Sequence, residues 1–111
     1  MITVEVIVEN KYVSLNITGA VDSNGAPELE QALSALFSEG KTVFLMDLSK
    51  VKYVSSAGLR VFLEYQKKVK SVKGKIVLCG LTEGVQEVFD ISGFAAIFQI
   101  FSDRESAIAK L

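Results

Sequence analysis

Two adjacent serines, Ser55 and Ser56, are the residues of this chain best placed to do chemistry. They follow a strongly apolar stretch, Val43 to Leu48, and precede Ala57-Gly58-Leu59, where an amphipathic pattern begins. This order puts a serine hydroxyl at the amino end of a helix and at the carboxyl side of a sheet, where ligands and partners usually dock. Unpaired N–H groups and the helix dipole favour negative charge there. The two serines therefore predict a phosphorylation site at which the surrounding backbone stabilises the phosphate.

A simpler interpretation is that the serines only cap the helix, because serine is a favoured capping residue. The two interpretations are compatible, since a capping serine can also be phosphorylated. Asp22 lies in the loop Gly19 to Gly25 and is either a turn-stabilising acid or a functional residue. Asp47 is expected to end its strand and to order the loop that follows.

The chain has no histidine and a single cysteine, Cys79. The absence of histidine removes Ser-His-Asp and Cys-His activation, histidine-based zinc sites and the commonest general base. The segment GLTEGVQ is too poor in glycine for a dinucleotide fingerprint. We therefore expect no enzyme activity, no metal and no cofactor. Cys79 lies in an apolar run and is predicted to be a small core residue in a reducing compartment.

The length of the chain predicts a single domain, residues 1–111. Its residues are 50% hydrophobic, and its formal net charge is −1. That charge argues against a nucleic-acid binder. A lysine cluster is expected to be a solvated helix face and loop; it comprises Lys67, Lys68, Lys70, Lys73 and Lys75. No signal peptide and no membrane-crossing apolar stretch are recognisable, so we expect a cytoplasmic location without membrane contact.

Alternating apolar residues predict two strands near the amino terminus, Ile2 to Val8 and Val13 to Ile17, joined by a turn at Asn10-Lys11. They should form an antiparallel hairpin. A helix follows, with Asn24 as its cap and Gly40 at its end.

The second half of the chain continues with alternating strands and helices. The helix after Ser56 is expected to bury one face; that face comprises Leu59, Phe62, Leu63, Gln66 and Val69. The strand Lys75 to Gly80 precedes a helix capped by Thr82 and closed near Gly93. A last strand, Ile97 to Phe101, precedes a capping box beginning at Ser102, whose helix packs through Ile108 and Leu111.

The resulting order, β-β-α-β-α-β-α-β-α, predicts an α/β fold with a mixed, mostly parallel sheet, an antiparallel amino-terminal edge strand and about four helices. Five aromatic residues are assigned to the core by default; they are Phe44, Tyr53, Phe62, Phe89 and Phe94. Asp90 and Ser92 are expected to shape a helix end.

Three phrases and the order of elements resemble the STAS domain, and more closely the bacterial anti-sigma factor antagonists. The phrases are ITGAVD (17–22), DLSKVKYVSSAGLR (47–60) and VFDISGF (88–94). The resemblance covers essentially the whole chain. It implies a single STAS-type domain that binds an anti-sigma factor while its switch serine is free. It also implies that the anti-sigma factor is an ATP-dependent serine kinase, whose phosphorylation of the antagonist ends the complex, and that a metal-dependent serine phosphatase reverses this step.

Carried over by position, the phosphorylated serine is Ser56. The partner-binding residues are then expected to be Asp22, Ser55, Ser56, Ala57, Gly58 and Arg60. Ser55 replaces the aspartate common in the family, which leaves Ser55 as an alternative phosphorylation site. Arg60 replaces a small residue, and it could pair with the phosphate or contact a partner.

Two other functions remain open at this stage. STAS-like domains also bind nucleotides or lipids, or serve as subunits of transport complexes, and a free-standing subunit of that kind would have a similar sequence. The oligomeric state that we expect from the resemblance is a monomer or a weak dimer.

Overall fold

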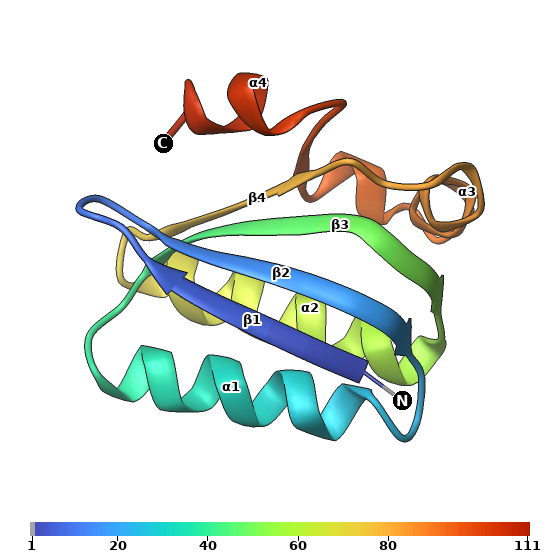
Figure 1. The fold of residues 1–111 in the computed structure, drawn as a ribbon, viewed down its shortest axis with the longest axis horizontal. Coiled ribbons are helices and arrows are strands. Elements are labelled where there is room, and N and C mark those ends of the chain that lie inside the picture. The colour runs from blue at the N-terminus through green and yellow to red at the C-terminus, as the bar shows by residue number, and fades with distance from the viewer. Residues whose placement is uncertain (1) are drawn as a thin grey trace.

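Five strands form one mixed sheet whose spatial order, β1-β2-β3-β4-β5, is also their order in the chain (Figure 1). The computed structural model describes residues 2–111. The strands are β1 (Ile2–Val8), β2 (Val13–Val21), β3 (Val43–Val54), β4 (Lys75–Cys79) and β5 (Gln99–Phe101). The helices are α1 (Ala26–Ser38), α2 (Ser56–Ser71), α3 (Glu83–Ile91) and α4 (Arg104–Ile108), with a 3₁₀ turn, η1 (Phe94–Ala96).

The strand directions confirm the predicted fold class. Strands β1 and β2 are antiparallel, and β2–β3, β3–β4 and β4–β5 are parallel. Helices α1 and α2 cover one face of the sheet, where the main hydrophobic core lies. The opposite face carries a smaller cluster, in which Ala107 of α4 packs on Leu45, Val77 and Cys79. Burial of Cys79 confirms its predicted place in the core.

Strand β2 shows how the alternation in the sequence builds these two faces. Val13, Leu15 and Ile17 are buried towards the helices. The intervening Ser14 and Asn16 point to the opposite face, where they meet polar side chains. The amino-terminal hairpin therefore combines an apolar and a polar face, as its sequence predicts.

Strand β3 is longer than predicted, and this changes the surroundings of the serine pair. It continues through residues 49–54, which the sequence suggests are a short loop. Its pairing with β2 accommodates irregularities near Thr18 and Ala20. In this extension Val51 and Val54 are buried, whereas Tyr53 is 54% exposed. The prediction of Tyr53 as a core residue was wrong, because the extended backbone turns its side chain away from the helices.

Several local predictions also need correction. Gly25, not Asn24, is the cap of α1, because Asp22 occupies the loop N–H groups instead. In α2, Val61 and Tyr65 are buried while Leu63 is only partly covered. Asp103, not Ser102, caps α4 by accepting a hydrogen bond from the Ser106 N–H.

The carboxyl-terminal predictions hold in part. Thr82 caps α3, as predicted. Strand β5 begins two residues later than predicted because η1 occupies the preceding segment. Helix α4 packs through Ala107, with Leu111 beside it, whereas Ile108 is exposed. Phe94 is only partly buried, although it packs against the core.

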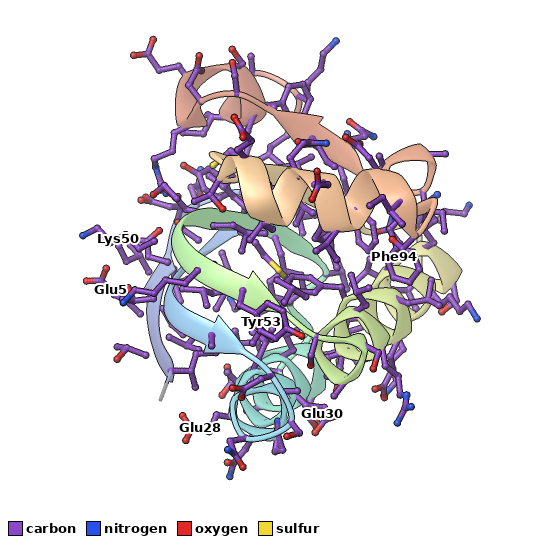
Figure 2. All side chains as sticks on the ribbon, turned by 90° about the vertical axis from the view of Figure 1, so that its right-hand side faces the viewer. Glu5, Glu28, Glu30, Lys50, Tyr53 and Phe94 are labelled. Carbon is purple, nitrogen blue, oxygen red and sulfur yellow. The ribbon has the colours of Figure 1, made fainter. Side chains whose placement is uncertain are left out.

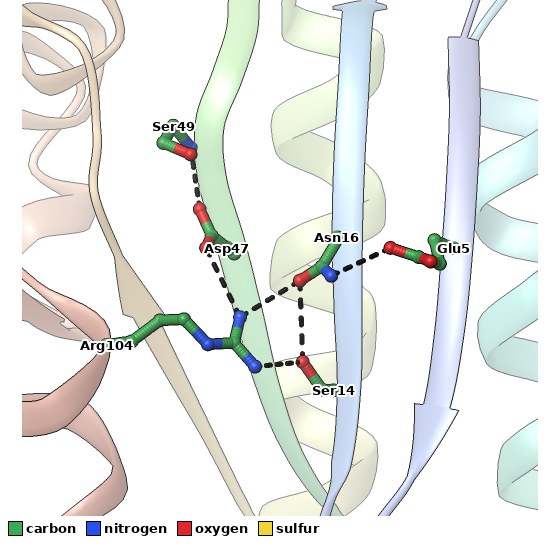
Figure 3. Close-up of polar contacts among 6 residues, drawn as sticks. All are labelled: Glu5, Ser14, Asn16, Asp47, Ser49 and Arg104. Atoms are coloured by element: carbon green, nitrogen blue, oxygen red, sulfur yellow. Dashed lines mark hydrogen bonds and ion pairs between the residues drawn. The ribbon is translucent and has the colours of Figure 1, made fainter.

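A polar cluster fastens α4 to the middle of the sheet (Figure 3). The Arg104 guanidinium donates hydrogen bonds to Ser14 Oγ at 2.8 Å and Asn16 Oδ1 at 3.0 Å, and it pairs with Asp47 Oδ2 at 3.2 Å. Burial raises the pKa of Asp47, but hydrogen bonds from Ser49 and Arg104 outweigh it and hold that pKa below its usual range. Asp47 therefore lies inside β3 and anchors Arg104, rather than ending the strand as predicted.

Replacing Arg104 should destabilise the fold, because Arg104→Gln leaves Asp47 without its cation and Ser14 without a donor. We expect the free energy of unfolding to fall by about 2 kcal/mol, the usual range for hydrogen bonds to charged groups. Urea denaturation followed by circular dichroism measures this change. The matched control is Arg60→Gln, which alters an exposed arginine and should change stability by less than about 0.5 kcal/mol. Equal losses in both variants would contradict an anchoring role for Arg104.

Candidate functional site

Ser55 is the residue that joins the end of β2 to the start of α2. Its backbone is extended, and its N–H donates to the Val21 carbonyl at 3.0 Å. Its hydroxyl donates to the same carbonyl at 3.4 Å and accepts from the Gly58 N–H at 3.4 Å. Ser55 is therefore the amino-terminal cap of the helix, and its side chain is engaged by the protein itself.

Ser56 is the first residue of α2, and it is exposed. Its position differs from that of its neighbour because the chain turns into the helix between them. The side chain of Ser55 points back to β2, whereas Ser56 lies on the surface where the first helical N–H groups begin. Of the two serines, Ser56 is the one whose hydroxyl a second protein can reach.

Gly58 brings the helix unusually close to the sheet. It is buried, and a Cβ atom there would overlap the Val21 carbonyl oxygen and crowd the side chains of Val21 and Val54. Any larger residue would push α2 away from β2 and β3. The requirement for glycine is thus steric, and Ala57 beside it is partly buried in the same junction.

Asp22 directly follows Val21, so it lies at the same end of the sheet as the serines. Its Oδ1 accepts hydrogen bonds from the N–H groups of Gly25 at 2.9 Å and Asn24 at 3.0 Å. These bonds, first that from Gly25 and then that from Asn24, lower the pKa of the carboxyl. The turn-stabilising interpretation of Asp22 is confirmed by this geometry. Asp22 also presents a fixed negative charge beside the junction at neutral pH.

Arg60 lies on the exposed surface of α2, four residues after Ser56. Residues four apart lie on the same side of a helix, one turn from each other. The structure thus gathers Asp22, Ser55 and Ser56 at one junction, with Arg60 on the next turn.

Tyr53 is a surface residue at this end of the molecule that sequence reasoning missed. In the sheet it pairs with Ala20, two residues before Asp22. Figure 2 views the end at which β2 and β3 finish, and there Tyr53 lies near the middle, with Glu28 and Glu30 below it and Phe94 to one side. The sequence does contain a sign of this surface segment, because two lysines, Lys50 and Lys52, flank Val51. Both lysines are exposed, whereas Val51 is buried.

Two kinds of feature are absent from the part of the chain that the structure describes. Among residues 2–111, no group of three or more histidine, cysteine, aspartate or glutamate side chains is arranged to hold a metal ion. No helix within the same residues has the length and apolar character needed to cross a membrane.

Comparisons with known proteins agree with the geometry. Residues 3–107 match the family model of the STAS domain. The chain is 44% identical over 93 residues to a putative anti-sigma factor antagonist, BtrV, of Bordetella bronchiseptica, covering 84% of this chain and 80% of that protein. It is 33% identical over 107 residues to the anti-sigma-B factor antagonist of Bacillus subtilis, covering 96% and 97% of the two chains.

Solved structures show the same fold at lower sequence identity. An anti-sigma factor antagonist from Mycobacterium paratuberculosis superimposes with a TM-score of 0.90 at 22% identity, covering 99% of this chain and 93% of that one. The phosphorylated form of the Bacillus protein SpoIIAA superimposes with a TM-score of 0.75 at 19% identity, covering 99% and 98%. With the family model spanning nearly the whole chain and relatives above 30% identity, this protein belongs to the STAS domain family.

Proposed function

We propose that this protein is an anti-sigma factor antagonist that is switched by phosphorylation of Ser56. The observation that carries the proposal is the separation of the two serines: Ser55 is engaged in capping α2, whereas Ser56 is exposed at the first turn. Relatives of 44% and 33% identity bear the name of anti-sigma factor antagonists, which supports the same function. In its free form the protein binds an anti-sigma factor through the end of the molecule where β2 and β3 finish.

Of the six residues expected to bind the partner, Asp22, Ser56 and Arg60 form the contact surface together with Tyr53, whereas Ser55, Ala57 and buried Gly58 form the junction that supports it. The anti-sigma factor is a serine kinase that positions ATP and supplies the catalytic base, so Ser56 needs only to be exposed and correctly presented. A metal-dependent serine phosphatase restores the free hydroxyl. The protein itself performs no catalysis in this cycle, and its effect on transcription follows from whether the anti-sigma factor is occupied.

Phosphorylation at this position suits the fold but opposes binding. The first turn of α2 provides unpaired N–H groups and the positive end of a dipole, and Arg60 lies one turn away. The phosphate adds a charge of about −1.5 to −2. A unit charge facing a like charge at about 4 Å costs about 4 kcal/mol at an effective dielectric constant of about 20. Because about 1.4 kcal/mol is a factor of ten in affinity, the complex weakens on the order of a thousandfold without refolding.

The first prediction of this proposal is that Ser56 is the phosphorylated residue. The purified protein and its Ser56→Ala and Ser55→Ala variants are incubated with ATP and soluble lysate of the source organism. Mass spectrometry should find phosphate on Ser56 in the original protein and in Ser55→Ala, and none in Ser56→Ala.

The Ser55→Ala variant is the matched control, since it removes the neighbouring hydroxyl and weakens the cap by about 1 kcal/mol but keeps the exposed serine. Phosphate on Ser55 alone would move the switch by one residue. A lysate that phosphorylates other proteins but neither serine would contradict the proposal and favour a ligand-binding or transport-subunit role.

A second prediction concerns the extent of the structural change on phosphorylation. Because α2 is held by Val21 and Gly58, we expect backbone chemical shifts to move only near residues 20–25 and 53–60. Two-dimensional NMR of the free and phosphorylated protein measures this. Shift changes spread through β4 and β5 would show that the switch works by rearrangement instead of local charge.

A third prediction assigns an anchoring role to Tyr53. Exposed tyrosines are frequent among the residues that dominate binding energy, and this one lies on the same end as Ser56. Tyr53→Ala should weaken binding of the purified kinase that phosphorylates Ser56 by about tenfold or more, while Tyr53→Phe keeps most of the affinity.

Isothermal titration calorimetry with the unphosphorylated protein measures the affinity. Val72→Ala is the control, because Val72 is similarly exposed but follows the opposite end of α2. If Tyr53→Ala and Val72→Ala bind equally well, Tyr53 lies outside the contact surface.

A further inference from the structure

Strand β1 forms an open edge of the sheet. Within residues 2–111 it pairs only with β2, and all seven of its residues pair without a register shift, so the strand is regular. It contains no proline and no lysine, the residues that commonly protect an edge. Three successive side chains are exposed and apolar: Val6 (40%), Ile7 (38%) and Val8 (58%). The opposite edge, β5, has only three residues.

The hairpin geometry determines which backbone groups of β1 point outwards. The Glu9 N–H donates to the Tyr12 carbonyl, so these two residues form a hydrogen-bonded pair beside the turn. In an antiparallel ladder such pairs alternate with non-hydrogen-bonded ones. Ile7 with Ser14 and Glu5 with Asn16 therefore bond to each other. The N–H and C=O groups of Val4, Val6 and Val8 then face away from β2 and lack a strand partner there.

The acidic residues and the length of β1 together narrow the ways in which two copies of this strand can pair. A pairing centred on Val4 leaves Val8 without a partner, and one centred on Val8 extends beyond the strand into the turn. A two-fold pairing centred on Glu5 puts Glu5 opposite Glu5 of the second copy, and one centred on Ile7 puts Glu5 opposite Glu9. Both place like charges directly across from each other, which is destabilising. A pairing centred on Val6 puts Glu5 opposite Ile7 and Val4 opposite Val8. It also joins the outward-facing residues of both copies in about six backbone hydrogen bonds.

The helix side of this edge has room for the second copy. A groove of about 370 Å³ is lined by Val4 of β1 and by Glu28, Gln31, Ala32 and Ala35 of α1. In the pairing centred on Val6, the residue beside Val4 is Val8 of the second copy, whose side chain points to the helix side of the sheet like that of Val4. The most exposed valine of β1 thus meets a groove bordered by two alanines.

We propose that this protein forms a two-fold symmetric dimer in which β1 pairs antiparallel with β1 of a second copy, centred on Val6. The two sheets then become one ten-stranded sheet in which the β1 edge of each copy is covered and only the short β5 strands remain at the edges. Because the two-fold axis reverses the strand direction, the ends of the two copies that carry Ser56 point in opposite directions. Each copy therefore keeps its switch end open, and the dimer presents two independent contact surfaces. The proposal does not depend on the proposed function.

Sedimentation velocity over a range of protein concentrations tests the dimer. The unmodified protein should show a concentration-dependent dimer. Val6→Lys brings two ammonium groups together at the axis and should raise the dimer dissociation constant by about tenfold or more. Val72→Lys makes the same change at a valine that is 51% exposed after α2, and it should leave the dimer unchanged. Circular dichroism verifies that both variants are folded.

Cysteine cross-linking tests the register. Glu5→Cys, Val6→Cys and Ile7→Cys each place a thiol at the centre of one of the three pairings. A residue paired with itself across the axis has a Cα–Cα distance of about 5.5 Å, which a disulfide can span. Mild oxidation should give a covalent dimer with Val6→Cys at least about tenfold faster than with the other two variants. Burial raises the pKa of the Cys79 thiol to about 11, so the native cysteine stays protonated and inert.

Three outcomes would overturn the proposal. The unmodified protein could sediment as a monomer at all concentrations up to the millimolar range. A dimer that forms equally well in Val6→Lys would use another surface. Faster cross-linking through Glu5→Cys or Ile7→Cys would exclude the pairing centred on Val6.

Discussion

The contact between the Val21 carbonyl and the first turn of α2 is the constraint on which the candidate site depends. That single oxygen accepts hydrogen bonds from the N–H and the hydroxyl of Ser55, and it lies where a side chain at position 58 would begin. The helix can approach β2 so closely only because residue 58 is glycine. Both the direction of α2 and the place where it starts follow from this contact.

This contact also gives two neighbouring serines different properties. Ser55 supplies the cap, so its hydroxyl is engaged and partly buried, whereas Ser56 begins the helix and faces solvent. A charge added to Ser56 meets a helix terminus that already favours negative charge. The same charge would repel an acidic partner surface that approaches Ser56. The proposed switch needs a rigid base rather than a moving part, and the junction of Val21, Ser55 and Gly58 provides one.

The two faces of the sheet contribute to the fold in different ways. The face towards α1 and α2 is held by apolar burial, and the long strand β3 runs through its centre. The opposite face has a smaller apolar cluster, and α4, a helix of five residues, depends on Arg104 to reach Ser14, Asn16 and Asp47. Because these polar groups satisfy one another, the sheet can hold a partly covered ion pair without leaving a polar group unpaired. Helix α4 contacts β3, β4 and β5, and the cover that it provides does not extend to the edge strand β1.

The sequence by itself determined the order of elements, the mixed sheet and the position of the serine pair, because periodicity and capping are local properties of the chain. It also identified Cys79 as a core residue. It left undecided whether Ser55 or Ser56 is exposed, and it misplaced Tyr53, Asp47 and the cap of α1. Those outcomes depend on groups far apart in the chain: Val21 meets Ser55 and Gly58, Arg104 meets Asp47, and β3 continues because β2 pairs with it. Such contacts form only when the strands are assembled, so the tertiary structure alone decided which side chains are engaged and which are free.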